Sequence, residues 1–317
     1  MGSHFVARLQ DDRRAYVVLD DLSRGNAGFV HPDRLVRGDV GDSKLVEELC
    51  REFGVDTVVH FAAYAYVGES VEEPERYYEN NVVKTVCLLH ALRSAGVQRF
   101  VFSSSCATYG ETASGCLISE DTPQVPVNPY GRTKLVVEQM LADYERAYGL
   151  RSVSLRYFNA AGASERHPLY EQHDPETHLI PLAVDAALGA TTLSIFGRDY
   201  ATPDGTCVRD FVHVDDLADA HVRAVERLCS GGASLRVNLG TGRGASVLEV
   251  VEAVRSATGA VVRFRFAERR PGDPAMLVAN PELANRELGW LPRYQDIRDT
   301  VRTAVQGYRR PELGIRP

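Results

Sequence analysis

The first half of the chain alternates short apolar runs with longer segments of helical periodicity. The apolar runs are YVVL at 16–19, TVVHFA at 57–62, FVF at 100–102 and SVSL at 152–155. Between them, apolar positions recur at the 3.6-residue period of an α-helix over about 43–53, 71–95 and 130–148. Strands that alternate with crossover helices predict an α/β fold with a doubly wound, Rossmann-like parallel sheet.

The pattern loosens after about Asn159, where loops and prolines become more frequent. We therefore expect two domains. Residues 1–158 would form the Rossmann-like domain, and residues 159–317 a smaller α+β domain over the carboxyl-terminal edge of the sheet. A segment near 211–240 is expected to return to the first domain.

Composition excludes several classes of protein. A formal net charge of −7 argues against a nucleic-acid-binding protein, which normally has a basic face. No apolar run is long enough to cross a membrane, and the first residues do not read as a signal peptide, so no membrane association is expected. The six cysteines and nine histidines show neither CxxC nor HExxH spacing, which predicts no metal site and a reducing, cytoplasmic location.

The segment Tyr130-Gly-Arg-Thr-Lys134 carries the clearest candidate chemistry. A spacing of four places both side chains on one helical face. A phenol with an ordinary pKa near 10 is a poor base at neutral pH, and a neighbouring ammonium group is expected to lower that pKa.

Three serines, Ser103, Ser104 and Ser105, follow the FVF run about 25 residues before this pair. They are expected at the carboxyl end of a strand, where open α/β sheets bind ligands. A serine run alone is more often a solvated turn, but here it completes a Ser/Tyr/Lys set.

These motifs resemble the short-chain dehydrogenase/reductase superfamily, and several longer segments resemble its UDP-galactose 4-epimerases. The segments include SSSCATYG (103–110), PYGRTK (129–134), LRYFNAAGA (155–163), DPETHLIP (174–181) and IFGRDYATPDGTCVRDFVHVDDLA (195–218). The resemblance implies NAD-dependent inversion at C4 of a UDP-hexose through a 4-keto intermediate. It assigns proton transfer to Tyr130, tuning of that group and ribose binding to Lys134, and a hydrogen bond to the reacting oxygen to Ser105.

The resemblance also implies two sets of binding residues. Asp20 matches the acid that binds the adenosine ribose, which favours NAD over NADP because a carboxylate repels a 2′-phosphate. The implied NAD contacts are Gly2, Asp20, Asp21, Asp39, Val40, Phe61, Ala62, Asn80, Ser103, Tyr130, Lys134 and Tyr157. The implied UDP-sugar contacts are Ser105, Asn159, His178, Leu179, Phe196, Arg209, Phe211, Arg270 and Asp273.

The chain departs from the family pattern at its start. The family opens with a strand and a turn of the form GGxGYIGSH, of which only Gly2 is present here. We expect a misassigned start or a clipped chain. The chain as written is expected to leave the two neighbouring strands unpaired on one edge, and to bind NAD weakly with little activity.

Alternatives remain open at this stage. One is a 4-epimerase for a UDP-N-acetylhexosamine or a UDP-pentose, since Leu277 is intermediate in size where the resemblance implies a limit on substrate bulk. Another is a catalytically impaired relative that only binds UDP-sugars. A 4,6-dehydratase is disfavoured because Cys106 and Ala107 directly follow Ser105, where the resemblance to that family would require an Asp-Glu pair. The resemblance also implies a homodimer built on the helices at about 71–95 and 130–148.

Overall fold

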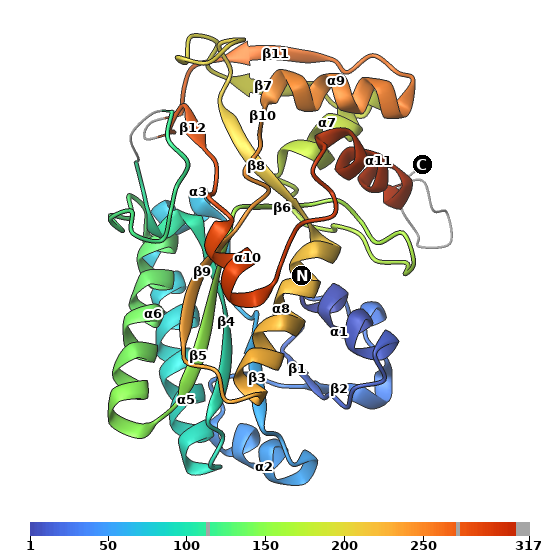
Figure 1. Ribbon diagram of the computed structural model, residues 1–317. Coiled ribbons are helices and arrows are strands. Elements are labelled where there is room, and N and C mark those ends of the chain that lie inside the picture. Colours follow the sequence, from blue (N-terminus) through green and yellow to red (C-terminus); the bar gives the residue numbers. More distant parts are fainter. Residues whose placement is uncertain (112–114, 271–272, 309–317) are drawn as a thin grey trace.

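A four-stranded parallel sheet forms the centre of the molecule. The computed structural model describes residues 1–111, 115–270 and 273–308. The strands of this sheet lie in the order β3-β4-β5-β9, and each adjacent pair is parallel. The predicted parallel α/β architecture is therefore confirmed (Figure 1). The four strands are β3 (Thr57–His60), β4 (Arg99–Ser105), β5 (Arg151–Tyr157) and β9 (Leu235–Leu239).

The two strands nearest the N-terminus form a separate parallel pair. These are β1 (Val18–Asp20) and β2 (Leu35–Arg37). Among the described residues β1 pairs only with β2, and β3 pairs only with β4. One edge of β1 and one edge of β3 therefore have no strand partner in this part of the chain, in agreement with the expected unpaired edges.

Helices cover both faces of the central sheet. Along β4, Phe100 and Phe102 point to one face, where they join α2, α5 and α6 in a buried core. Val101 points to the other face and packs with α8 and α10. This alternation is the period of two that a strand imposes on its side chains. Helix α1 lies outside α8 (Figure 1). The helices are α1 (Gly2–Asp11), α2 (Ser43–Phe53), α5 (Lys84–Ser94), α6 (Pro129–Tyr148), α8 (Val214–Cys229) and α10 (Glu282–Leu288).

The prediction of a single helix over about 71–95 was wrong. Pro74 is the first residue of a new helix and has no N–H to continue the preceding one, so the segment divides there. A turn of π-helix then precedes α5, and such turns are frequent at functional sites. The pieces are α3 (Val67–Glu72), α4 (Pro74–Tyr78), the π-turn η3 (Glu79–Val83) and α5.

A second group of elements lies beyond the carboxyl ends of the central strands (Figure 1). Strand β8 pairs with β6, β10 and β12, while β7 pairs with β11. The chain passes from β8 directly into α8 and returns to the central sheet as β9. The elements are β6 (Asn159–Ala161), α7 (Leu179–Ala187), β7 (Leu193–Phe196), β8 (Val208–His213), β10 (Gly244–Ser246), α9 (Val247–Thr258), β11 (Phe264–Ala267), β12 (Met276–Leu277) and α11 (Ile297–Tyr308).

Among the described residues, three short 3₁₀ turns connect these elements: η1 (Ala27–Phe29), η2 (Pro32–Arg34) and η4 (Cys106–Thr108). Across the described ranges, no helix combines the length and the apolar character needed to span a bilayer.

Candidate active site

The start of α6 carries Tyr130 and Lys134 into the interior. Asn128 caps the helix by accepting a hydrogen bond from the N–H of Gly131 at 2.8 Å, and Pro129 is the first helical residue. Both functional side chains are buried, with 9% of Tyr130 and 4% of Lys134 exposed. Gly131 is required here because a Cβ would lie 2.3 Å from the carbonyl oxygen of Ala107. The helix therefore approaches the end of β4 closely.

The side chains of the three serines at the end of β4 lie on two different faces of the sheet. Ser105 ends the strand, and its Oγ accepts from the N–H of Ala107 at 3.2 Å. Ser103 lies on the same face and donates to Nε2 of His221, because Nδ1 of that ring already donates to a backbone carbonyl. Ser104 points to the opposite face and donates to Glu138 at 2.5 Å. Burial of all three excludes the solvated-turn interpretation.

Lys134 is fixed by its surroundings. Its Nζ donates to the carbonyl oxygen of Ser103 at 2.8 Å, and it lies 4.9 Å from the ring centre of Phe102 and 5.8 Å from that of Tyr130. Burial lowers the pKa of Lys134 to about 7, and the nearby carboxylate of Glu138 opposes this change.

The expectation that Lys134 lowers the pKa of Tyr130 was wrong for the protein alone. Burial raises the pKa of Tyr130, the neighbouring Tyr157 adds to the rise, and the hydrogen bond with Ser105 only partly offsets it. The ammonium group is directed at the carbonyl of Ser103. Desolvation of the phenolate therefore outweighs the influence of the lysine, and Tyr130 rests in its protonated form.

Sequence reasoning missed a buried ion pair one helical turn beyond Lys134. Glu138 and Arg156 are 1% and 3% exposed, and the guanidinium binds the carboxylate through two nitrogens at 2.9 and 2.6 Å. Arg156 also donates to the hydroxyl of Tyr109 at 2.8 Å. The available signal was that Glu138 continues the four-residue spacing of Tyr130 and Lys134 on an inward-facing stripe.

The implied NAD contacts gather at the carboxyl ends of β1, β2 and β3. Asp20 ends β1 and accepts from the N–H of Leu22 at 2.8 Å, while Asp21 accepts from Ser23. Asp39 and Val40 follow β2, and Asp39 pairs with Lys84 at 2.6 Å.

The remaining implied NAD contacts lie beside β3 and β5. Phe61 and Ala62 follow β3 directly, and Gly2 at the start of α1 lies against the ring of Phe61. Asn80 is in the π-turn η3. Tyr157 ends β5 and is within 6.2 Å of the His221 ring, centre to centre. Carboxylates that accept hydrogen bonds, aromatic ring faces and the buried Tyr/Lys pair lie along one sheet edge, where open α/β sheets bind dinucleotides.

The implied UDP-sugar contacts come from the second group of elements. Arg209 in β8 is ion-paired with Asp273, and the guanidinium of Arg270 lies 4.0 Å from the ring centre of Phe196 at the end of β7. Asn159 and Phe211 are partners in the β6–β8 register.

Three further residues complete this picture. His178 occupies the N-cap position of α7 without a side-chain cap hydrogen bond, and Leu179 is the first residue of that helix. Leu277 in β12 is half-buried and lies opposite Arg209 in the register.

The two groups of residues approach each other beside Ser105. Burial raises the pKa of the Cys106 thiol to about 12, and Arg209 is close enough to oppose this rise. Cys106 directly follows Ser105 in the chain. A guanidinium from β8 therefore lies near the end of β4, where the Ser/Tyr/Lys set converges.

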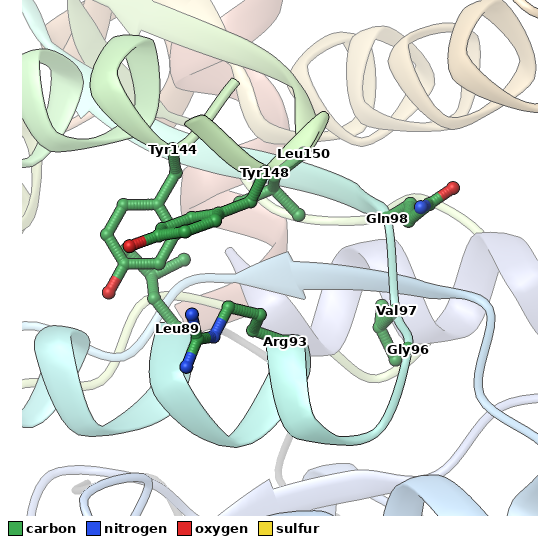
Figure 2. A pocket seen from close by; sticks show the side chains of 8 residues that line it. All are labelled: Leu89, Arg93, Gly96, Val97, Gln98, Tyr144, Tyr148 and Leu150. Carbon is green, nitrogen blue, oxygen red and sulfur yellow. The ribbon is translucent and has the colours of Figure 1, made fainter. Parts of the chain in front are cut away.

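The pocket in Figure 2 is a different feature. It lies between α5 and α6 and is lined by Leu89, Arg93, Gly96, Val97, Gln98, Tyr144, Tyr148 and Leu150. Residues 96–98 precede β4, so this pocket is at the amino ends of the strands. Tyr148 is 18 residues beyond Tyr130 on α6, which corresponds to about 27 Å along a helix. The pocket is therefore not the active site.

A parallel sheet with buried Ser, Tyr and Lys side chains at its carboxyl edge defines a nicotinamide-dependent enzyme of the short-chain dehydrogenase/reductase class. The chain belongs to the NAD dependent epimerase/dehydratase family, which it matches over residues 1–240.

Individual relatives are consistent with this family. The chain is 49% identical over 305 residues to UDP-glucose 4-epimerase of Rhizobium leguminosarum bv. trifolii, covering 96% of this chain and 93% of that protein. It is similar to the crystal structure of UDP-glucose 4-epimerase from Brucella ovis in complex with NAD, with a TM-score of 0.93, 50% identity and coverage of 99% and 95%. It is also similar to the enzyme from Bifidobacterium longum in complex with NAD⁺ and UDP, with a TM-score of 0.89, 36% identity and coverage of 96% and 94%.

Proposed function

We propose that this protein is an NAD-dependent isomerase that interconverts UDP-glucose and UDP-galactose by inversion at C4 through a 4-keto intermediate. The observation that carries the proposal is the burial of Tyr130 and Lys134 together at the end of β4, beside Ser105. Neither side chain points into solvent. The family match and the relatives support the same reaction.

Two residues, Tyr130 and Ser105, act on the reacting oxygen. Tyr130 removes the proton of the sugar 4-hydroxyl and later returns one, while Ser105 hydrogen-bonds the same oxygen. Since burial keeps Tyr130 protonated in the protein alone, its ionisation needs added positive charge. When bound, NAD supplies the hydride acceptor and the positive charge of the nicotinamide ring. Lys134 holds the nicotinamide ribose and, in the fraction of molecules in which it is protonated at neutral pH, adds positive charge on the same side.

The nucleotide end of the substrate must stay fixed while the keto sugar turns over. Arg209 and Arg270 suit this task, because guanidinium groups bind diphosphates through charge-assisted hydrogen bonds. Arg209 is already held by Asp273, which orients it before substrate binds. The remaining proposed UDP-sugar contacts are Ser105, Asn159, His178, Leu179, Phe196, Phe211 and Asp273.

The NAD contacts are proposed along the carboxyl edge of the first three strands. Asp20 would accept hydrogen bonds from the adenosine ribose, which favours NAD over NADP. The other proposed contacts are Gly2, Asp21, Asp39, Val40, Phe61, Ala62, Asn80, Ser103 and Tyr157. In this assignment residues 1–158 provide the NAD domain with the returning segment near 211–240, and residues 159–317 provide the substrate domain.

A homodimer is part of the proposal. Apolar side chains are exposed along α3, η3 and α5, including Val71, Val83 and Val86 at 62%, 46% and 44%. An apolar helical face of this kind is typical of subunit interfaces. Sedimentation analysis should give twice the chain mass, and a monomer at micromolar concentration would contradict this part. A reducing, cytoplasmic location is proposed from the free cysteines.

The test of the reaction is Tyr130→Phe, with Tyr148→Phe at the exposed end of the same helix as its control. Tyr130→Phe should lower kcat for UDP-galactose about 10²- to 10⁴-fold, the usual contribution of a positioned acid or base. Binding of NAD and UDP, measured by calorimetry, should remain. Tyr148→Phe should keep full activity. If Tyr130→Phe kept the kcat of the wild type, Tyr130 would not be the acid and base, and the alternative of a UDP-sugar-binding protein would be favoured.

A further inference from the structure

We propose that Glu171, His173, Glu176 and His178 form a binding site for one divalent transition-metal ion, with Zn²⁺ as the best fit. All four residues lie in the eight-residue segment that leads into α7, and each offers one ligand atom. These four atoms lie within 4.8 Å of one another. No metal site was expected, because the chain has neither CxxC nor HExxH spacing; the spacing of these four residues is E-x-H-x-x-E-x-H.

The distances match a tetrahedral site. Zinc bound to imidazole nitrogen and carboxylate oxygen at about 2.0–2.2 Å requires its ligands to be roughly 3.3–3.5 Å apart. Nδ1 of His173 lies 3.2 Å from Oε1 of Glu171 and 3.6 Å from Oε1 of Glu176. Nδ1 of His178 lies 3.8 Å from Oε1 of Glu176, and it also contacts Glu171. Small rotations of the side chains would therefore complete the coordination.

The chemistry of the four ligands selects the metal. Two imidazoles and two carboxylates balance the charge of a divalent ion when both histidines are neutral. Imidazole ligands suit zinc, nickel and copper, whereas calcium and magnesium prefer all-oxygen sites.

The site is supported from the sheet and open to solvent. The carboxylates of Glu171 and Glu176 lie inside, with side-chain exposures of 18% and 14%, while the imidazoles are more exposed and leave a path for an ion. The ring of His173 packs edge-on against Tyr66, with ring centres 5.7 Å apart. Tyr66 is held in turn by hydrogen bonds between its backbone and the hydroxyl of the buried Tyr77.

The position gives the ion a structural role. The 171–178 segment ends at the N-cap of α7, and its His173 contacts the loop after β3 through Tyr66. A metal ion would therefore fix the start of α7 against the edge of the sheet. Because His178 is also a proposed UDP-sugar contact, the tests below measure metal binding directly and do not rely on epimerase activity.

The test uses the tag-free full chain, stripped with a chelator and kept reduced. Zn²⁺ affinity is measured by competition with a chromophoric chelator, and Co²⁺ serves as a spectroscopic probe. The wild type should bind one Zn²⁺ per chain and show the intense visible bands of tetrahedral Co²⁺ without thiolate charge-transfer bands. Zn²⁺ should also raise the Tm.

Two variants and one control decide the assignment. His173→Ala and the isosteric Glu176→Gln should each weaken Zn²⁺ binding at least about 100-fold, since losing even an outer partner typically costs 10- to 100-fold. His31→Ala, at an exposed histidine far along the chain, should bind like the wild type. Circular dichroism checks that each variant is folded. Absence of stoichiometric Zn²⁺ binding, or unchanged binding in the folded Glu176→Gln variant, would overturn the proposal. The four side chains would then form only ion pairs with one another.

Discussion

Replacing Lys134 with Met is expected to stabilise the fold while abolishing activity. Burial lowers the pKa of this lysine from 10.5 to about 7, so its charged form is destabilised by about 5 kcal/mol relative to the unfolded chain. Methionine has similar length and carries no charge. It gives up the hydrogen bond to Ser103, which is worth about 1–3 kcal/mol. The net gain at pH 7 is therefore about 2–4 kcal/mol.

The pH dependence follows from the same shift. Between about pH 7 and 10.5 the unfolded chain keeps the lysine proton and the folded protein loses it. Stability therefore rises with pH in this window, by about 1.4 kcal/mol per pH unit from this group. Below pH 7 the full cost is present, and above about 10.5 it vanishes. The advantage of Lys134→Met should accordingly shrink as pH rises from 7 to 10.

Urea unfolding of the nucleotide-free protein at several pH values measures this difference. The exposed Lys44→Met, with 87% of its side chain accessible, is the matched control and should leave stability unchanged. Nucleotide is removed because a ligand that binds only the folded state would add its own stabilisation. The reasoning would be refuted if Lys134→Met were less stable than the wild type at pH 7 by a margin that does not change with pH.

Three further outcomes are expected. Glu138→Gln should destabilise the protein by about 3–5 kcal/mol in urea unfolding, because it leaves the buried charge of Arg156 without the opposite charge of a carboxylate; a double replacement by Leu and Met should recover most of the loss. Asp20→Asn keeps the oxygen that accepts from the backbone, yet removes the charge, so the ratio of NAD to NADP affinity should fall in calorimetry; an unchanged ratio would remove this residue from the ribose site. Arg209→Met should raise KM for the UDP-sugar about 10- to 100-fold with a smaller change in kcat, since a hydrogen bond to a charged group contributes about 1.5–3 kcal/mol.

Local features of the fold were predictable from sequence. The helix expected at 43–53 matches α2, because Asp42 caps its start and Gly54 ends it in the left-handed region at φ 59°. It was also predictable that the side chains of Tyr130 and Lys134 lie on one face of the helix, because residues four positions apart are neighbours there. The division of 71–95 was missed because its apolar periodicity continues through Pro74, although the proline itself is a local signal.

The sequence alone determined which residues share a helical face and where the strands end, because these depend on neighbours within a few positions. Only the tertiary structure decided the electrostatics. The pKa of Tyr130 rises because distant strands remove water from it, and Glu138 of α6 pairs with Arg156 of β5 on one face of the sheet. The convergence of Glu171, His173, Glu176 and His178 likewise required the folded path of the chain. Desolvation and charge pairing depend on distances in space, which residue order does not specify.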